Sequence, residues 1–356
     1  MKNIITSLVC CFLLSIPSSV VFSQSTADSL LNFIKQNKER ASLYLKKNDT
    51  VTAALNENKL MPLASTVKIM VAIEFAQQAG NNVLNVNGLI PLSELNKYYI
   101  PNTDGGAHPR WINYERSLGH IINDSVQLID VARGMIIFSS NANTEFLMDL
   151  LGIDKIQNNI QLLGLKQHTF IYPLVSSLFL YQNLKKINED KIISAIKKLN
   201  DEDYAKSVLL IHDHLKNDSN YKKNFRPQDL TLKMQKEWSD RLPASTTKDY
   251  VQVCSILNNR KFFDSSTYQV LAQVLETLME VPANKAWLLH AGMKGGSTIF
   301  VLTKALYATL KNETKIEMGY FFNDLTGAEN MRLQTWMNNF EIRVLTDEKF
   351  RKQMAF

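Results

Sequence analysis

The chain has 356 residues, of which 45% are hydrophobic and 21% charged, and its formal net charge is +6. This balance excludes a disordered or fibrous chain and is enough for a large buried core in one or two domains. The positive excess is modest, and the lysines between Lys185 and Lys236 alternate with Glu and Asp. We interpret them as the solvated face of helices and expect no nucleic-acid partner.

Residues 1–23 differ in composition from the rest of the chain. Lys2 precedes an apolar run from Ile4 to about Ile16, and Val21 and Ser23 occupy the −3 and −1 positions of a possible cleavage site. The run is short for a bilayer span, so we predict a secretory signal peptide rather than a membrane anchor. The mature protein is then expected to be secreted or periplasmic.

The mature chain, residues 24–356, is predicted to form one catalytic domain. Cys10 and Cys11 would leave with the signal peptide, so only Cys254 remains and no internal disulfide is possible. Cys254 lies in an apolar helical pattern, which is typical of a buried cysteine. Stability must therefore come from the core.

Hydrophobic periodicity predicts strands near both ends of the mature chain and helices between them. In chain order we expect a helix at 25–38, a hairpin at 41–58, a buried helix at 65–79 stopped by Gly80, a loop at 98–111, helices at 124–138 and 144–152, a Lys-rich helical insertion at about 178–240, a helix at 243–259 capped by Ser245, a hairpin at 297–325 and a helix at 329–340. The expected fold is α/β, an α+β sandwich. Its antiparallel sheet would combine N- and C-terminal strands with flanking helices, beside a mostly helical subdomain.

A serine and a lysine, Ser65 and Lys68, stand one helical turn apart in the apolar stretch MPLASTVKIMVAIEF. Residues i and i+3 share a helix face, and a buried lysine is rare unless it is paired. Desolvation would lower the pKa of Lys68, and its neutral amine could then take the proton of the Ser65 hydroxyl. Alternatively, Ser65 is only an N-cap. The same spacing at Ser219–Lys222 and Ser245–Lys248 has structural explanations, a charged loop and a cap.

Two further patterns each occur once. Ser139-Ser140-Asn141 lies between two predicted helices, and Lys294-Gly295-Gly296 lies at the start of a predicted strand. Taken alone, Ser139 and Asn141 could simply be helix caps, and Gly295-Gly296 could be a turn or a bulge. Together with Ser65 and Lys68 they supply a second hydroxyl, an amide and a second cation, which are complementary groups for acyl transfer.

This ordered set resembles the motifs of the penicillin-recognising serine hydrolases, and most closely those of the class A β-lactamase-like group. The resemblance implies that fold, with Ser65 as nucleophile and Lys68 as its base. It further implies a set of supporting roles: Ser139 as proton relay, Asn141 binding the acyl side-chain amide, Lys294 stabilising the relay and attracting a substrate carboxylate, Gly295 and Gly296 on the substrate-binding strand, and the N–H groups of Ser65 and Ser297 as oxyanion hole. Tyr98 or Tyr99 could form a cleft wall, or be a plain core or surface aromatic.

The chain departs from the family pattern at three places. Ser140 replaces an Asp, Gly295 replaces a Thr, and the region 167–179 lacks the Glu that activates the deacylating water. Acylation therefore looks supported, and rapid hydrolysis of the acyl-enzyme does not. The alternatives to a hydrolase of β-lactams are an acylated or cell-wall-fragment-binding sensor and a D-Ala-D-Ala peptidase.

The expected partner is a small β-lactam or a peptidoglycan-type peptide, and no cofactor is expected. We also expect no metal site, because His108, His120 and His168 have no partner at a metal-binding spacing. The insertion at 178–240 is either a mobile cap that limits which substrates reach Ser65 or a helical elaboration remote from the site.

Overall fold

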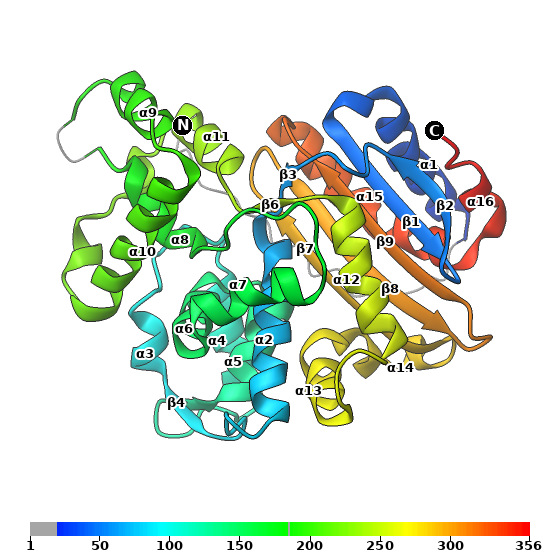
Figure 1. Ribbon diagram of the computed structural model, residues 1–356, viewed down its shortest axis with the longest axis horizontal. Coiled ribbons are helices and arrows are strands. Elements are labelled where there is room, and N and C mark those ends of the chain that lie inside the picture. Colours follow the sequence, from blue (N-terminus) through cyan, green and yellow to red (C-terminus); the bar gives the residue numbers. More distant parts are fainter. Residues whose placement is uncertain (1–19, 184–185) are drawn as a thin grey trace.

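The computed structural model describes residues 20–183 and 186–356 (Figure 1). Most of the predicted signal peptide, residues 1–19, lies outside the described residues. The chain forms a sheet-containing part and a helical part that pack side by side. In the part of the chain that the structure describes, no helix has both the length and the apolar character needed to cross a bilayer.

A five-stranded antiparallel sheet joins the two ends of the chain, as predicted. Its order is β2-β1-β9-β8-β7, formed by β2 (Thr50–Leu55), β1 (Ala41–Lys47), β9 (Lys315–Phe322), β8 (Leu302–Leu310) and β7 (Leu288–Ser297). Asn48 and Asp49 turn the first hairpin with φ of 50° and 64°, the left-handed values that a two-residue hairpin loop requires. The sequence predicts that the second hairpin begins its first strand at residue 297. This start is wrong, because β7 ends at Ser297 and the chain turns before β8 begins at Leu302.

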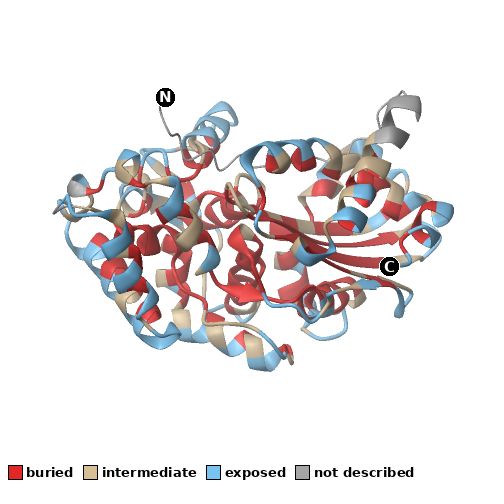
Figure 2. Cartoon of the chain, turned by 90° about the horizontal axis from the view of Figure 1, so that it is seen from above, coloured by how far each residue is buried: buried red, intermediate tan, exposed pale blue. Residues whose placement is uncertain are grey.

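Helices cover both faces of this sheet (Figure 1). On one face lie α1 (Val20–Gln36) and α15 (Gly327–Thr346), whose apolar residues form a core with β1, β8 and β9. On the other face α12 (Thr247–Asn259) crosses β8 and β9. Buried residues accordingly concentrate in the sheet and the central helices, with exposed residues around the rim (Figure 2).

The helical part is built around α2 (Lys68–Gly80), which is buried nearly all round. Its partners include α5 (Leu128–Ile137), α6 (Asn141–Leu151), α7 (Ile153–Leu162) and α13 (Ser265–Leu275). Gly80 ends α2 for a different reason from the one predicted. A Cβ there would lie 2.7 Å from the Thr267 nitrogen, so glycine permits the close approach of α13 rather than a left-handed cap.

The remaining elements are short or belong to the periphery. They are η1 (Lys38–Arg40), β3 (Met61–Pro62), η2 (Ala64–Val67), β4 (Leu89–Pro91), α3 (Leu92–Asn96), α4 (Ala107–Ser117), β5 (Ser125–Gln127), α8 (Leu174–Leu178), η3 (Phe179–Tyr181), α9 (Glu189–Lys197), α10 (Asp201–Asn217), η4 (Tyr221–Asn224), η5 (Pro227–Asp229), α11 (Leu232–Asp240), β6 (Ala244–Ser245), η6 (Thr277–Glu280), α14 (Pro282–Lys285) and α16 (Glu348–Lys352). The insertion thus contains α9, α10 and α11. Its apolar residues form a separate core with α8 and with Tyr98 and Ile100.

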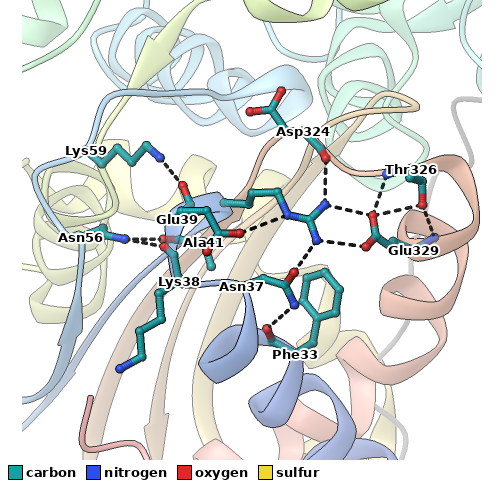
Figure 3. Close-up of polar contacts among 11 residues, drawn as sticks. Phe33, Asn37, Lys38, Glu39, Ala41, Asn56, Lys59, Asp324, Thr326 and Glu329 are labelled. Carbon is teal, nitrogen blue, oxygen red and sulfur yellow. Dashed lines mark hydrogen bonds and ion pairs between the residues drawn. The ribbon is translucent and has the colours of Figure 1, made fainter.

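Arg40, the last residue of η1, links the chain just before β1 to the start of α15 through Glu329. Figure 3 shows Glu329 beside Thr326 and the position of Asn37 and Asp324 around it. The Arg40 guanidinium donates to both carboxylate oxygens of Glu329, at 3.1 and 3.0 Å, and to the Asp324 carbonyl at 2.9 Å. It also donates to the side-chain oxygen of Asn37. Glu329 belongs to a capping box with Thr326, which is the N-cap of α15. The hydrogen bonds from Arg40 lower the pKa of Glu329 to about 2.

Candidate active site

Ser65 lies on the short 3₁₀ turn η2, immediately before α2, rather than in the α-helix predicted for it. It is not the cap of either helix, since Leu63 and Val67 take those positions without a side-chain hydrogen bond. Ala64 before it has a φ of 45°, a conformation that residues other than glycine adopt infrequently. The Thr303 hydroxyl holds this turn by donating to the Leu63 carbonyl at 2.7 Å. The backbone therefore fixes Ser65 against β8.

Lys68 is the first residue of α2 and is completely buried. Its Nζ donates to the Ser139 carbonyl at 2.7 Å and to Asn141 Oδ1 at 2.8 Å, and it lies 3.2 Å from Ser139 Oγ. The structure thus brings the first two sequence motifs together across 71 residues of chain. The buried lysine has the polar partners that its burial requires.

The Ser139 hydroxyl lies between two lysines. Its oxygen is 3.2 Å from Lys68 Nζ and 3.1 Å from Lys294 Nζ, which approaches from β7. A hydroxyl has two acceptor sites and one donor, so with both acceptor sites engaged its proton is available for a further partner. Ser139 has a φ of 62°, a left-handed conformation that the surrounding structure must hold in place.

His108 and Ser140 help to hold that conformation. Ser140 caps α6 by accepting from the Asn143 backbone, and its hydroxyl is 2.9 Å from His108 Nδ1. The His108 ring also contacts Tyr99 and Trp111, and burial lowers its pKa to about 4. Sequence reasoning missed His108, because it is 32 residues from Ser140 and no local pattern connects the two.

The strand β7 passes very close to the Ser65 turn. A Cβ on Gly296 would lie 2.4 Å from the Leu63 carbonyl oxygen and 2.5 Å from the Ser65 nitrogen, so only glycine fits there. A Cβ on Gly295 would meet its neighbours at 3.4 Å or more, which is ordinary contact. The approach at Gly296 brings Ser297, the last residue of β7, to the same cavity as Ser65.

A cavity opens beside Ser65 and gathers residues from both parts of the fold. It is lined by Ala64, Ser65, Thr103, Asn141, Leu174, Gln235, Trp238, Ser239, Leu242, Ser297, Thr298 and Ile299. Of the described residues that line it, none carries a carboxylate. Tyr98 is instead buried against His212 with ring centroids 4.9 Å apart, and Tyr99 packs on His108. Neither tyrosine is among the residues that line the cavity, whereas Thr103 of the same loop is.

Comparison with known proteins agrees with this arrangement. Residues 25–265 match the Beta-lactamase2 model, described as the beta-lactamase enzyme family. The chain belongs to this β-lactamase enzyme family. No curated protein matches the chain.

Solved structures show that this β-lactamase-family chain has the class A fold. A class A β-lactamase from Bacteroides cellulosilyticus has a TM-score of 0.54 at 14% identity, covering 92% of this chain and 99% of its own. A β-lactamase from Sphaerobacter thermophilus has a TM-score of 0.55 at 13% identity, covering 90% and 97%. A PBP-A mutant in an acyl-enzyme complex with penicillin G has a TM-score of 0.50 at 12% identity, covering 90% and 96%.

In this β-lactamase-family chain, the segment that lacks the expected glutamate presents Leu174 to the cavity. Glu145 of α6 holds the segment by accepting from the backbone of Val175 at 2.6 Å and of Ser176 at 2.9 Å. It also accepts from the Ser176 hydroxyl at 2.7 Å. This buried carboxylate is therefore engaged in positioning α8 and does not line the cavity.

The other Ser–Lys spacings lie elsewhere. The Ser245 hydroxyl in β6 donates to the Gln167 carbonyl at 2.8 Å, and the cap of α12 is its neighbour Thr246. The prediction of Ser245 as the cap is therefore wrong by one residue. Lys222 donates to backbone carbonyls of Asn96 and Tyr99, away from the Ser65 cavity lining.

Proposed function

We propose that this β-lactamase-family protein is an exported serine hydrolase that forms an acyl-enzyme on Ser65. Its substrates would be β-lactams or D-alanyl peptides and esters, small molecules whose carbonyl can enter the cavity beside Ser65. The observation that carries the proposal is the Ser139 hydroxyl, held between Lys68 and Lys294 next to that cavity. Export rests on the predicted signal peptide at residues 1–23.

Acylation begins with removal of the Ser65 proton by Lys68. In its neutral form, the amine can donate two hydrogen bonds, to the Ser139 carbonyl and to Asn141, and keep its lone pair for that proton. Ser65 Oγ then bonds to the substrate carbonyl carbon. The N–H groups of Ser65 and Ser297, both residues of the cavity wall, would stabilise the oxyanion.

Collapse of this intermediate breaks the bond between the carbonyl carbon and the leaving nitrogen. The Ser139 hydroxyl donates its proton to that nitrogen and regains one from Lys68, which returns the lysine to its neutral form. Lys294 is the cation that would favour negative charge on Ser139 Oγ and attract a substrate carboxylate. The side-chain amide of Asn141 would bind the acyl group.

Turnover of the acyl-enzyme is the step with the least support. Leu174 occupies the cavity wall in the segment where the family carries the water-activating glutamate, and the lining residues offer no other carboxylate. This observation favours a second candidate function, a sensor that is acylated and turns over slowly. A D-Ala-D-Ala peptidase would use the same acylating groups.

Labelling with a fluorescent penicillin tests the proposal. We expect a stoichiometric adduct, mapped to Ser65 by mass spectrometry of the digested protein. A label on another residue, or no label with any penicillin, cephalosporin or D-alanyl ester, would contradict the assignment. A time course with a chromogenic cephalosporin then separates the two functions. Sustained release of product indicates the hydrolase, and a burst of one equivalent indicates the sensor.

The insertion contributes directly to the proposed site. Gln235, Trp238 and Ser239 of α11 line the cavity, and the Ser239 hydroxyl donates to Thr298 Oγ1 at 2.9 Å. These contacts favour a cap at the proposed site over an elaboration remote from it. We propose that α11 forms a fixed wall and that α9 and α10, which share the separate apolar core, cap the rim above it.

A further inference from the structure

We propose that Glu115, His120 and Asp130 form a binding site for one divalent transition-metal ion of the zinc class. The site lies where the end of α4 meets the start of α5, and none of its three residues lines the Ser65 cavity. This proposal does not depend on the function proposed for Ser65.

The three side chains already converge on one point. Glu115, His120 and Asp130 each offer one ligand atom, and these three atoms lie within 4.8 Å of one another. His120 Nδ1 is 2.8 Å from Glu115 Oε2 and 3.7 Å from Asp130 Oδ2. A tetrahedral zinc ion with bonds of about 2.0–2.1 Å needs ligand atoms roughly 3.3 Å apart. Shifts of about half an ångström in these two separations, and of up to about 1.5 Å between the two carboxylate oxygens, would therefore admit the ion.

The Glu115 carboxylate is oriented by a hydrogen bond from Trp111, whereas the Asp130 carboxylate has only an ion pair with His120. Trp111 Nε1 donates to Glu115 Oε1 at 3.0 Å, which directs the other oxygen, Oε2, to His120. Asp130 is only 8% exposed, and its carboxylate accepts no hydrogen bond in the described part of the chain. Buried carboxylates are normally hydrogen-bonded. The ion pair of Asp130 with His120, at 3.7 Å, is too long to be a hydrogen bond, and a bound cation would supply the missing partner.

The donor set fits zinc-class ions in chemistry and charge. One imidazole nitrogen and two carboxylate oxygens are ligands that such ions accept, and two negative charges offset the charge of a divalent ion. Coordination through Nδ1 requires its lone pair, so the ring proton must sit on Nε2; a protonated ring would release one proton to solvent. The His120 side chain is 45% exposed, which gives the ion a path from solvent.

An ion here would join two helices that lead into the candidate active site. Trp111 of α4 packs on α5 so closely that a Cβ on Gly134 would lie 2.5 Å from its Nε1. The chain that leaves α5 reaches Ser139 two residues later. The expected consequence is a higher melting temperature, because an ion bound only to the folded state stabilises it by mass action.

Binding of Zn²⁺ itself to the full chain, freed of metal with a chelator, tests the site. We expect wild type to bind one more zinc ion per chain than His120→Ala, in equilibrium dialysis with metal analysis. Zinc at 100 times its Kd should raise the melting temperature of wild type by about 5 °C. His120→Ala should remove that shift, and Asp130→Asn should weaken zinc binding at least tenfold.

His214→Ala is the matched control, because this exposed histidine lies outside the cluster. It should bind zinc as wild type does. Equal zinc stoichiometry and equal thermal shifts in wild type and His120→Ala would overturn the proposal, as would a loss of the same size in His214→Ala. The far-UV circular dichroism spectrum and a cooperative thermal transition of each metal-free variant show whether the chain is folded, so a folding failure cannot be mistaken for loss of the metal site.

Discussion

At the scale of single residues, the candidate site depends on how the buried amine of Lys68 is accommodated. Lys68 Nζ donates hydrogen bonds to Ser139 and Asn141, so the same atom holds the second motif and would serve as the proposed base. A substitution that removes Nζ therefore affects both roles.

Replacement of Lys68 by alanine should slow acylation of Ser65 by roughly 10²–10⁴-fold, the usual loss when a general base is removed. The chain should still fold, because removal of a buried amine also removes its desolvation cost. Stopped-flow labelling with a fluorescent penicillin measures the rate. Lys248→Ala and Lys222→Ala serve as controls and should label at the wild-type rate. A Lys68→Ala rate within a few-fold of wild type would exclude the base.

His108 provides a prediction about pH. Its folded-state pKa is about 4 against an ordinary value of 6.5, because burial disfavours the charged ring. Below pH 6.5 the unfolded chain therefore binds a proton that the folded chain does not. His108 should therefore contribute a loss of roughly 3 kcal/mol of unfolding free energy as the pH falls from 6.5 to 4.

Urea unfolding across this range, compared between wild type and His108→Gln, isolates the His108 contribution. The variant should be less stable at pH 7 and should show a shallower loss toward pH 4. His214→Gln, at an exposed position, should follow the wild-type curve. Parallel curves for wild type and His108→Gln would show that His108 is protonated equally in both states.

At the scale of elements, the segment around α8 bears on hydrolysis of the proposed acyl-enzyme, because it places Leu174 on the cavity wall. Leu174→Glu places a carboxylate on the cavity wall in the segment where the family carries its glutamate. We expect deacylation to accelerate by up to roughly 10²-fold, provided that the new carboxylate can activate water. Release of bound fluorescent penicillin measures the rate. Leu242→Glu, another leucine of the same cavity, is the control and should leave deacylation slow.

The helix α11 forms part of the cavity wall. Trp238 lines it and donates from Nε1 to the Ser177 hydroxyl at 2.7 Å, which ties α11 to α8. Trp238→Ala should raise the labelling rate of a bulky penicillin relative to a small one by roughly tenfold. Trp336→Ala, on α15, should change neither rate. Equal changes for both probes in Trp238→Ala would mean that α11 does not select substrates by size.

At the scale of the whole molecule, the N-terminal and C-terminal parts of the chain are joined twice. The strands β1 and β9 pair in the sheet, and Arg40 pairs with Glu329 beside it. The Arg40–Glu329 pair links residues 289 positions apart, and the pKa of Glu329 is about 2 against an ordinary value of 4.5. The stabilisation by ionised Glu329 is therefore complete above pH 4.5 and is lost as the pH falls through about 2.

Glu329→Gln should lower the unfolding free energy at pH 7 by about 1–2 kcal/mol, less than the whole pKa shift implies because solvent screens the pair. The difference from wild type should shrink below pH 4.5 and vanish near pH 2. Urea unfolding at pH 7, 4 and 2.5 measures it. Glu313→Gln, at an exposed turn, is the control. A difference that stays constant with pH would assign the loss to packing rather than to charge.

The sequence by itself determined the two hairpins, the buried α2 and the motifs that contain Ser65, Ser139 and Lys294. These are local signals, since alternation, helical periodicity and turn residues depend on neighbours within a few positions. The family fold followed from the order of the motifs, and the structure confirms the predicted sheet of N- and C-terminal strands.

Which side chains from distant parts of the sequence come into contact was determined only by the tertiary structure. The contact of His108 with Ser140, the use of Glu145 to anchor α8, and the cavity wall from α11 join segments that no local pattern connects. The same reason explains why spacing predicted no metal site although Glu115, His120 and Asp130 converge. It also explains Gly80 and Gly296, whose need for glycine comes from the close approach of a distant segment and not from a turn of their own.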